Sequence, residues 1–154
     1  MNLSDKITVV TGAASGIGKA TAKAFAEVGG MVYMGDLNEE NGEKVAEELR
    51  AAGGKATFIR LDITDDASIA GFKDQIIGES GRLDVLANVA GWGHTEFFAQ
   101  SAPADWDKEI DINLKGPMKM CHAFVPSMFE QNYGRIVNVS SDAGRVGSLA
   151  ESVY

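Results

Sequence analysis

Cysteine is almost absent from this sequence of 154 residues, with Cys121 the only one. A single thiol excludes a disulfide within the chain and a zinc site built on cysteines. It is also typical of a reducing compartment, so we expect a cytoplasmic protein. No run approaches the ~18 apolar residues of a membrane-spanning helix, and the first ten residues hold no apolar signal core. Membrane insertion and secretion are therefore not expected.

Basic residues are also scarce. Lys and Arg together number 14 against 22 Asp and Glu, which gives a formal net charge of −8 and a pI near 4.7. So acidic a surface repels phosphate backbones and anionic lipid headgroups. We therefore expect neither a nucleic-acid nor a membrane partner.

Proline is rare, at 3 residues, whereas glycine is abundant, at 18. Without proline or other low-complexity composition beside them, these glycines are expected at turns and close backbone approaches. The hydrophobic share of 45% and the charged share of 23% are ordinary for a globular protein. The length suits one domain, so we treat residues 1–154 as a single unit.

Short apolar runs alternate with helical patterns along the chain. The runs predict strands, and the apolar spacing between them predicts helices, one of them with Thr64 as N-cap and another kinked at Pro126. Apolar rather than alternating strands indicate a parallel sheet covered on both faces. Right-handed crossovers then favour an α/β fold with a doubly wound parallel sheet, the Rossmann fold, in strand order 3-2-1-4-5. The strands are predicted at 6–11, 31–35, 56–61, 83–89 and 135–140, and the helices around 17–28, 45–49, 69–77, 104–110 and 112–131.

A glycine-rich turn connects the first strand to the first helix. Gly12 permits a tight turn, Gly16 lets backbone N–H groups approach a pyrophosphate, and Gly18 lets the helix pack closely. The helix then presents unpaired N–H donors and the positive end of its dipole to an anion. No Gly-Lys-Ser/Thr follows, so a Walker-type loop is not indicated. The residues predicted to cradle a dinucleotide are Gly12, Ser15, Gly16, Ile17 and Gly18.

Asp36 ends the second strand, 18 positions after Gly18. An acidic side chain there accepts hydrogen bonds from an adenine-ribose diol and repels a 2′-phosphate. No Lys or Arg lies within 13–15 or directly after Asp36 to offset that repulsion. The sequence therefore predicts NAD rather than NADP as cofactor.

Further motifs follow the remaining strands. Asp62-Ile63 follows the third strand, and Asn88-Val89-Ala90-Gly91 follows the fourth. Asn113 lies in the first turn of the long helical pattern, Ser141 follows the fifth strand, and Tyr154 comes 13 residues later. Together with the glycine turn, these motifs resemble the short-chain dehydrogenase/reductase family over nearly the whole chain, with Val89 where the family carries a second Asn.

The resemblance implies reversible hydride transfer between a secondary alcohol and the nicotinamide. Tyr154 would be the base, Ser141 would hydrogen-bond the substrate oxygen, and Asn113 would hold a water in the proton relay. Asp62, Ile63, Asn88, Ala90 and Gly91 would contribute to cofactor binding. The family's long helix commonly packs against its copy, which implies a homo-oligomer, a dimer or a tetramer.

The segment 141–154 and Gly91-Trp92 are also similar to the 2-hydroxycyclohexanecarboxyl-CoA dehydrogenases. That subgroup implies a cyclic 2-hydroxyacyl-CoA ester as the alcohol substrate, or the corresponding ketone.

The family motif Tyr-x-x-x-Lys is incomplete here, because the sequence stops at Tyr154. A phenol with a pKa of about 10 is scarcely ionised at pH 7 without such a Lys. We therefore expect the 154-residue polypeptide alone to be close to inactive. We also expect its fifth strand to form an apolar open edge that favours association.

Other functions stay open at this point. A non-catalytic NAD-binding fragment would share the motifs through Asn113 and lack the Lys. A hydrolase would need a Gly-x-Ser-x-Gly elbow, and Ser15 stands one place too late. Neither His94 nor His122 has neighbours in the sequence at metal-ligand spacing, so no metal is expected.

Overall fold

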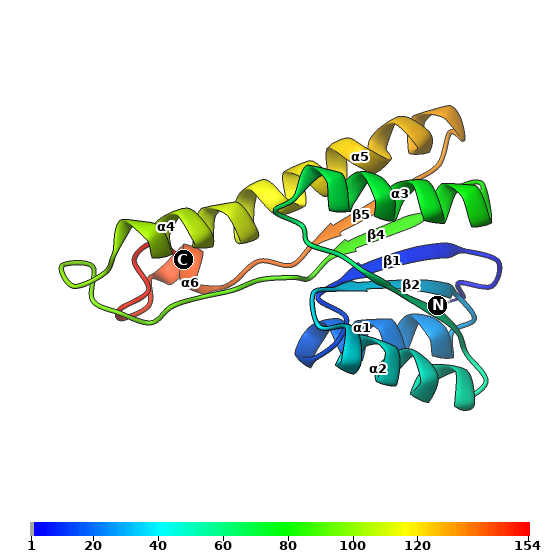
Figure 1. The fold of residues 1–154 in the computed structure, drawn as a ribbon, viewed down its shortest axis with the longest axis horizontal. Helices are drawn as coiled ribbons and strands as arrows, with labels where there is room; N and C mark the ends of the chain where they lie inside the picture. Colours follow the sequence, from blue (N-terminus) through cyan, green and yellow to red (C-terminus); the bar gives the residue numbers. More distant parts are fainter. Residues whose placement is uncertain (1) are drawn as a thin grey trace.

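The computed structural model describes residues 2–154, which form one parallel sheet with helices on both faces (Figure 1). α1 and α2 cover one face, and α3 and α5 cover the other. α4 and α6 lie beyond the carboxyl ends of the strands, at the same end of the molecule as the C-terminus. The strands are β1 (Ile7–Thr11), β2 (Met31–Asp36), β3 (Lys55–Arg60), β4 (Val85–Asn88) and β5 (Arg135–Asn138). The helices are α1 (Gly16–Glu27), α2 (Glu39–Ala51), α3 (Asp66–Ser80), α4 (Pro103–Ile110), the π-helical turn η1 (Asp111–Lys115), α5 (Gly116–Glu130) and α6 (Ala143–Val146).

The sheet order is β3-β2-β1-β4-β5, and every pair is parallel, which confirms the predicted doubly wound fold. The order reverses between β1 and β4. Clefts for ligands open outside the carboxyl ends of the strands at such a switch point. The topology therefore places the glycine turn after β1 beside the loop after β4.

Successive strand residues feed two different cores. Val9, Tyr33 and Leu86 point toward α3 and α5, where they meet large side chains such as Phe72 and Phe124. The opposite face is rich in alanine, which lets α1 and α2 pack close to the sheet. Its buried members are Val10, Ala13, Ala22, Ala26, Val32, Met34, Val45, Ala46, Leu49, Ala56 and Ala87.

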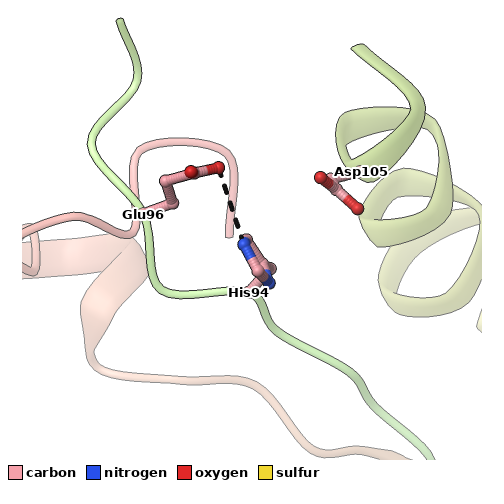
Figure 2. Close-up of side chains that lie close together, drawn as sticks. All are labelled: His94, Glu96 and Asp105. Atoms are coloured by element: carbon pink, nitrogen blue, oxygen red, sulfur yellow. Dashed lines mark ion pairs between the residues drawn. The ribbon is translucent and has the colours of Figure 1, made fainter. Parts of the chain in front are cut away.

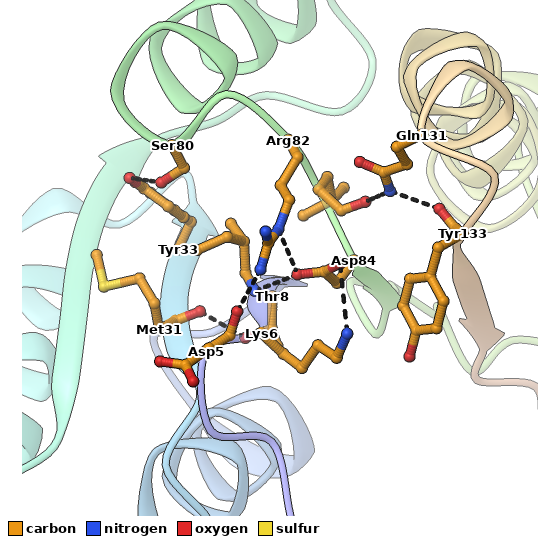
Figure 3. A network of polar contacts seen from close by, with 12 residues as sticks. Asp5, Lys6, Thr8, Met31, Tyr33, Ser80, Arg82, Asp84, Gln131 and Tyr133 are labelled. Carbon is orange, nitrogen blue, oxygen red and sulfur yellow. Dashed lines mark hydrogen bonds and ion pairs between the residues drawn. The ribbon is translucent and has the colours of Figure 1, made fainter.

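A polar network fixes the amino ends of β1 and β4, at the end of the sheet away from the glycine turn (Figure 3). The carboxylate of Asp84, only 3% exposed, accepts hydrogen bonds from the N–H of Ile7 at 2.9 Å and from Nε of Arg82 at 3.1 Å. Asp84 also donates its own N–H to the carbonyl of Ile7 at 2.9 Å. This exchange fixes the register between the starts of β1 and β4.

Some predicted boundaries were wrong by a few residues. Asp65, not Thr64, is the N-cap of α3, and its carboxylate accepts the N–H of Ala67. α5 continues past Pro126, and the interruption of α geometry comes earlier, in η1. β4 begins at Val85, two residues later than predicted, and β4 and β5 end early because the chain leaves the ladder at Asn88 and Asn138. Among the described residues, no helix has the length and apolarity to span a membrane.

Gly18 gives the first test of this packing. A Cβ there would lie 2.0 Å from the carbonyl oxygen of Gly12, a backbone atom that cannot turn aside. Gly18→Ala should destabilise the fold by about 1–3 kcal/mol through this overlap. Gly71→Ala is the matched control, since Gly71 is exposed within α3 with open space around it. It should stabilise the fold by about 0.5–1 kcal/mol. Urea unfolding of both variants measures the difference, and equal effects would contradict the close approach.

Candidate active site

A cleft of about 1600 Å³ opens at the carboxyl ends of the strands. Its volume is more than a small metabolite fills, because typical pockets for such ligands measure roughly 300–1,000 Å³. Its walls combine residues from the glycine turn, the ends of β2 and β3, the loop after β4, and the segment after β5. The sequence-predicted site residues that line it are Gly12, Ser15, Gly16, Ile17, Gly18, Asp36, Asp62, Ile63, Ala90, Gly91, Asn113, Ser141 and Tyr154.

The glycine turn has the geometry that its spacing predicts. Gly12 has φ +68°, and a Cβ there would lie 2.8 Å from Cα of Ala90, so the two chain segments touch through backbone. Gly16 has φ +52°, and the place of its missing side chain is open space. A ligand can therefore approach the turn at Gly16, while Gly12 holds the turn against the loop after β4.

The N-terminus of α1 faces the cleft uncapped. Ser15 stands at the N-cap position, but its side chain makes no capping hydrogen bond. The first turn of α1 also contains no acidic residue to occupy the positive end of the dipole. Because the first N–H groups of a helix have no partner within it, they are available to an anion. The N-terminus of α1 can therefore bind the pyrophosphate of a dinucleotide through its main-chain N–H groups.

Asp36 is held at the rim by two main-chain donors. Its Oδ2 accepts the N–H of Ala14, and its Oδ1 accepts the N–H of Asn38, both at 2.9 Å. The first bond ties the end of β2 to the glycine turn. Each oxygen keeps a further lone pair for a hydroxyl donor. Among the described residues that line the cleft, Lys108 is the only Lys or Arg, and it comes from α4.

The carboxylate of Asp62 follows β3 and accepts two hydrogen bonds from one neighbour. Oδ1 receives the hydroxyl of Thr64 at 2.7 Å and its N–H at 2.9 Å. The hydroxyl bond is the main cause that lowers the pKa of Asp62 below its ordinary value. The side chain therefore stays ionised at neutral pH and offers an acceptor to the cleft.

Thr11 and Asn88 support the cleft without forming its surface. The Thr11 hydroxyl accepts the N–H groups of Val89 and Ala90, both at 3.0 Å, and so holds the loop after β4. Asn88 is 3% exposed and donates to Oδ1 of Asn138 at 2.8 Å, which joins β4 to β5. Asn88 is thus the one predicted site residue that does not line the cleft. The sequence offered a signal for Thr11, a β-branched hydroxyl directly before the first glycine.

Asn113 lies inside η1 and clamps one residue of the facing loop. Its Oδ1 accepts the N–H of Trp92 at 2.9 Å, and its Nδ2 donates to the Trp92 carbonyl at 2.6 Å. This bidentate contact fixes the peptide groups on both sides of Trp92. One lone pair of Oδ1 stays available for a water.

Ser141 and Tyr154 line the cleft from the segment that follows β5. The Ser141 hydroxyl accepts the N–H of Ala143 at 3.2 Å, so its own proton is free to be donated. The Tyr154 ring rests on Gly93, where a Cβ would lie 3.4 Å from the ring atom Cδ2. Tyr154 is 43% exposed, which leaves its ring accessible from the cleft.

Two residues of the cleft have roles that sequence reasoning missed. Nζ of Lys108 lies 3.8 Å above the ring of Trp92, and the His94 ring stacks on the same indole at 6.0 Å. Trp92 and Lys108 both line the cleft on the side of Tyr154. They lie 16 positions apart in the sequence, so no local pattern pairs them.

Comparison with known proteins agrees with this geometry. Residues 6–154 match the family model described as short chain dehydrogenase. The chain is 38% identical to the 3-oxoacyl-[acyl-carrier-protein] reductase FabG of Thermotoga maritima, covering 100% of this chain and 63% of that protein. It is 37% identical to the cyclopentanol dehydrogenase of Comamonas testosteroni, covering 99% and 61%. The chain therefore spans less than two thirds of the length of these curated relatives.

A solved structure of a metagenomic short-chain oxidoreductase in complex with NADP superposes with a TM-score of 0.94 at 37% identity. The match covers 99% of this chain and 69% of that one.

Thr11 gives a test of the site's support. Thr11→Val keeps the shape of the side chain but leaves the N–H groups of Val89 and Ala90 without their acceptor. We expect a loss of about 1–3 kcal/mol for each donor left unsatisfied. Thr57→Val in β3 is the control, because the described structure shows no hydrogen bond from that hydroxyl. Chemical denaturation of both variants makes the comparison, and two equally stable variants would remove Thr11 from the support of the loop.

Proposed function

The chain belongs to the short-chain dehydrogenase family, and from this premise we propose that its residues, in a protein that also supplies the Lys of Tyr-x-x-x-Lys, carry out reversible hydride transfer between a secondary alcohol and NAD. One observation carries the proposal. The uncapped glycine turn and the side chains of Ser141 and Tyr154 share the walls of a single cleft. A dinucleotide held at the turn would thus have its reactive end on the same side as a hydroxyl and a phenol.

The side chains divide the work of the reaction. NAD, when bound, supplies the hydride acceptor or donor. In the oxidation direction Tyr154, as the phenolate, takes the proton from the alcohol hydroxyl and becomes the phenol, while Ser141 donates a hydrogen bond to the same oxygen as negative charge develops there. Asn113 keeps Trp92 and the loop after β4 in place, and its remaining lone pair holds a water for proton exchange.

The preference for NAD rests on the surroundings of Asp36. Its fixed carboxylate suits the two hydroxyls of a ribose, and the nearest basic residue on β3, Arg60, pairs with Glu39 at 3.5 Å. A 2′-phosphate would meet the carboxylate of Asp36 there, and the neighbouring guanidinium of Arg60 is already paired with Glu39. The structure of the metagenomic short-chain oxidoreductase is a complex with NADP. We therefore base the preference for NAD in this protein on its own residues around Asp36.

For the substrate we propose a cyclic secondary alcohol, with cyclic 2-hydroxyacyl-CoA esters as the specific class. Trp92 adds an apolar ring to the lining of the cleft, and Lys108, whose Nζ lies 3.8 Å above that ring, offers a cation to a carbonyl or phosphate. One relative is named for cyclopentanol and another for a 3-oxoacyl group on acyl-carrier protein. This substrate proposal is separate from the hydride transfer itself.

We also propose that the protein is a homo-oligomer in the cytoplasm. Exposed apolar side chains lie at helical spacing along the consecutive elements α4, η1 and α5, and a second copy of the chain would cover them. They are Ile110, Leu114, Met118 and Phe129, between 39% and 77% exposed.

Asp36→Ala tests the cofactor preference. Losing a charged acceptor should weaken NAD binding about 10- to 100-fold, while NADP gains because the repulsion is gone. Glu40→Gln, an exposed carboxylate at the start of α2, is the control and should leave both affinities unchanged. Calorimetric titration of each protein with both cofactors measures this. Equal affinities in the unmutated protein, or a preference for NADP, would refute the role of Asp36.

Tyr154→Phe tests the proposed reaction in the complete protein. It should remove nearly all oxidation of secondary alcohols while NAD still binds, since only the acid–base group is lost. Ser141→Ala should lower kcat about 10²- to 10³-fold, as loss of an oxyanion donor does. Tyr133→Phe is the matched control, because Tyr133 does not line the cleft. Its ring lies under Nζ of Lys6, and phenylalanine keeps that contact.

Turnover is measured with simple cyclic alcohols and with cyclic 2-hydroxyacyl-CoA esters. Near-normal turnover by Tyr154→Phe would refute the base. A protein that binds NAD but oxidises no alcohol would instead support the non-catalytic interpretation. Equal rates with both substrate classes would remove the CoA-ester proposal alone.

A further inference from the structure

Three side chains with metal-ligating atoms meet outside the cleft, on the loop after β4 and the first turn of α4 (Figure 2). They are His94, Glu96 and Asp105, and one ligand atom from each lies within 4.8 Å of the other two. Nε2 of His94 is 3.5 Å from Oε2 of Glu96. Figure 2 shows Asp105 directed toward these two from the neighbouring helix.

The two carboxylates lack a permanent cation. The small hollow they share is also lined by His94, Phe98, Ser101, Trp106, Ala150, Ser152 and Val153, with no Lys or Arg among its described lining residues. Asp105 makes no ion pair within 4.0 Å in the described structure, and Glu96 pairs only with the imidazole. Two carboxylates at this separation repel each other unless a positive charge lies between them.

The main chain holds two of these side chains from sites outside the cluster. The N–H of His94 donates to the buried carboxylate of Glu109 at 2.8 Å, and the His94 ring stacks on Trp92. The N–H of Glu96 donates to the carbonyl of Ala150, also at 2.8 Å. His94 and Glu96 are thus held in place by contacts that do not use their ligating atoms.

We propose that His94, Glu96 and Asp105 bind one divalent transition-metal ion of the zinc type. Zn²⁺ takes imidazole nitrogen and carboxylate oxygen at about 2.0–2.2 Å in a tetrahedron, so its ligand atoms lie roughly 3.5 Å apart. The His94–Glu96 pair already has this separation, and Asp105 has to approach by about an ångström. A water completes four ligands. Ca²⁺ and Mg²⁺ are disfavoured, since they require six or more ligands, predominantly oxygens.

The ion would join the loop after β4 to α4 at the rim of the cleft. The same loop carries Trp92 and Thr95, which line the cleft. Binding therefore orders the wall beside Tyr154 without contacting the reacting atoms. This role does not depend on the proposed hydride transfer.

Calorimetric titration of the complete, metal-stripped protein with Zn²⁺ tests the site. We expect one Zn²⁺ per chain, and visible absorption bands of a tetrahedral Co²⁺ complex when Co²⁺ replaces it. His94→Ala, Glu96→Gln and Asp105→Asn should each weaken binding at least about 10-fold, and the triple variant should abolish it. His122→Ala and Glu130→Gln on α5 are the matched controls and should leave affinity and stoichiometry unchanged.

Circular dichroism confirms that each variant is folded, and the two amide variants preserve side-chain shape. Absence of Zn²⁺ binding in the unmutated protein would overturn the proposal. So would Zn²⁺ binding that survives in the triple variant, or equal binding of Ca²⁺.

Discussion

The close contact between Gly12 and Ala90 is the constraint on which the rest of the site depends. The turn after β1 and the loop after β4 touch through backbone because Gly12 has no side chain, and the hydroxyl of Thr11 secures the contact. On one side this contact sets the direction in which α1 leaves the sheet. On the other it starts the loop that passes Trp92, which Asn113 of η1 holds, and leads into α4. A change at this point would move both the phosphate-binding end and the substrate end of the cleft.

Electrostatics in the cleft follow from the same arrangement. Its lining contains several carboxylates and one Lys, so an anionic cofactor is not attracted by the overall charge. Attraction has to come from oriented main-chain N–H groups at α1, which act at short range and only on a group placed against them. The acidic surroundings thus favour a ligand whose charge is concentrated at one position over polyanions in general.

Local patterns in the sequence predicted most of the fold, because apolar runs determine which segments are buried on both faces. The glycine spacing likewise predicted the turn, since φ values and close approaches there are properties of a few adjacent residues. Contacts between distant segments were not predictable in the same way. The burial of Asn88 against Asn138, the Asn113–Trp92 clamp and the approach of Asp105 to His94 all depend on how loops fold back. The cap of α3 shifted to Asp65 because two neighbouring residues can both cap, and only the backbone direction decides between them.

The two tryptophans give the molecule a spatially selective optical signal. Trp92 lies between Lys108 and His94, and Trp106 stacks on Phe98 at 5.0 Å while its indole N–H donates to Ser101. Trp92 therefore lines the cleft and Trp106 lines the small hollow beside His94, Glu96 and Asp105, and neither indole is buried in the sheet. Intrinsic fluorescence in this protein consequently reports the order of the rim, whereas far-ultraviolet circular dichroism reports the sheet and its helices. A rim that loosens before the sheet melts would appear as two transitions at different temperatures.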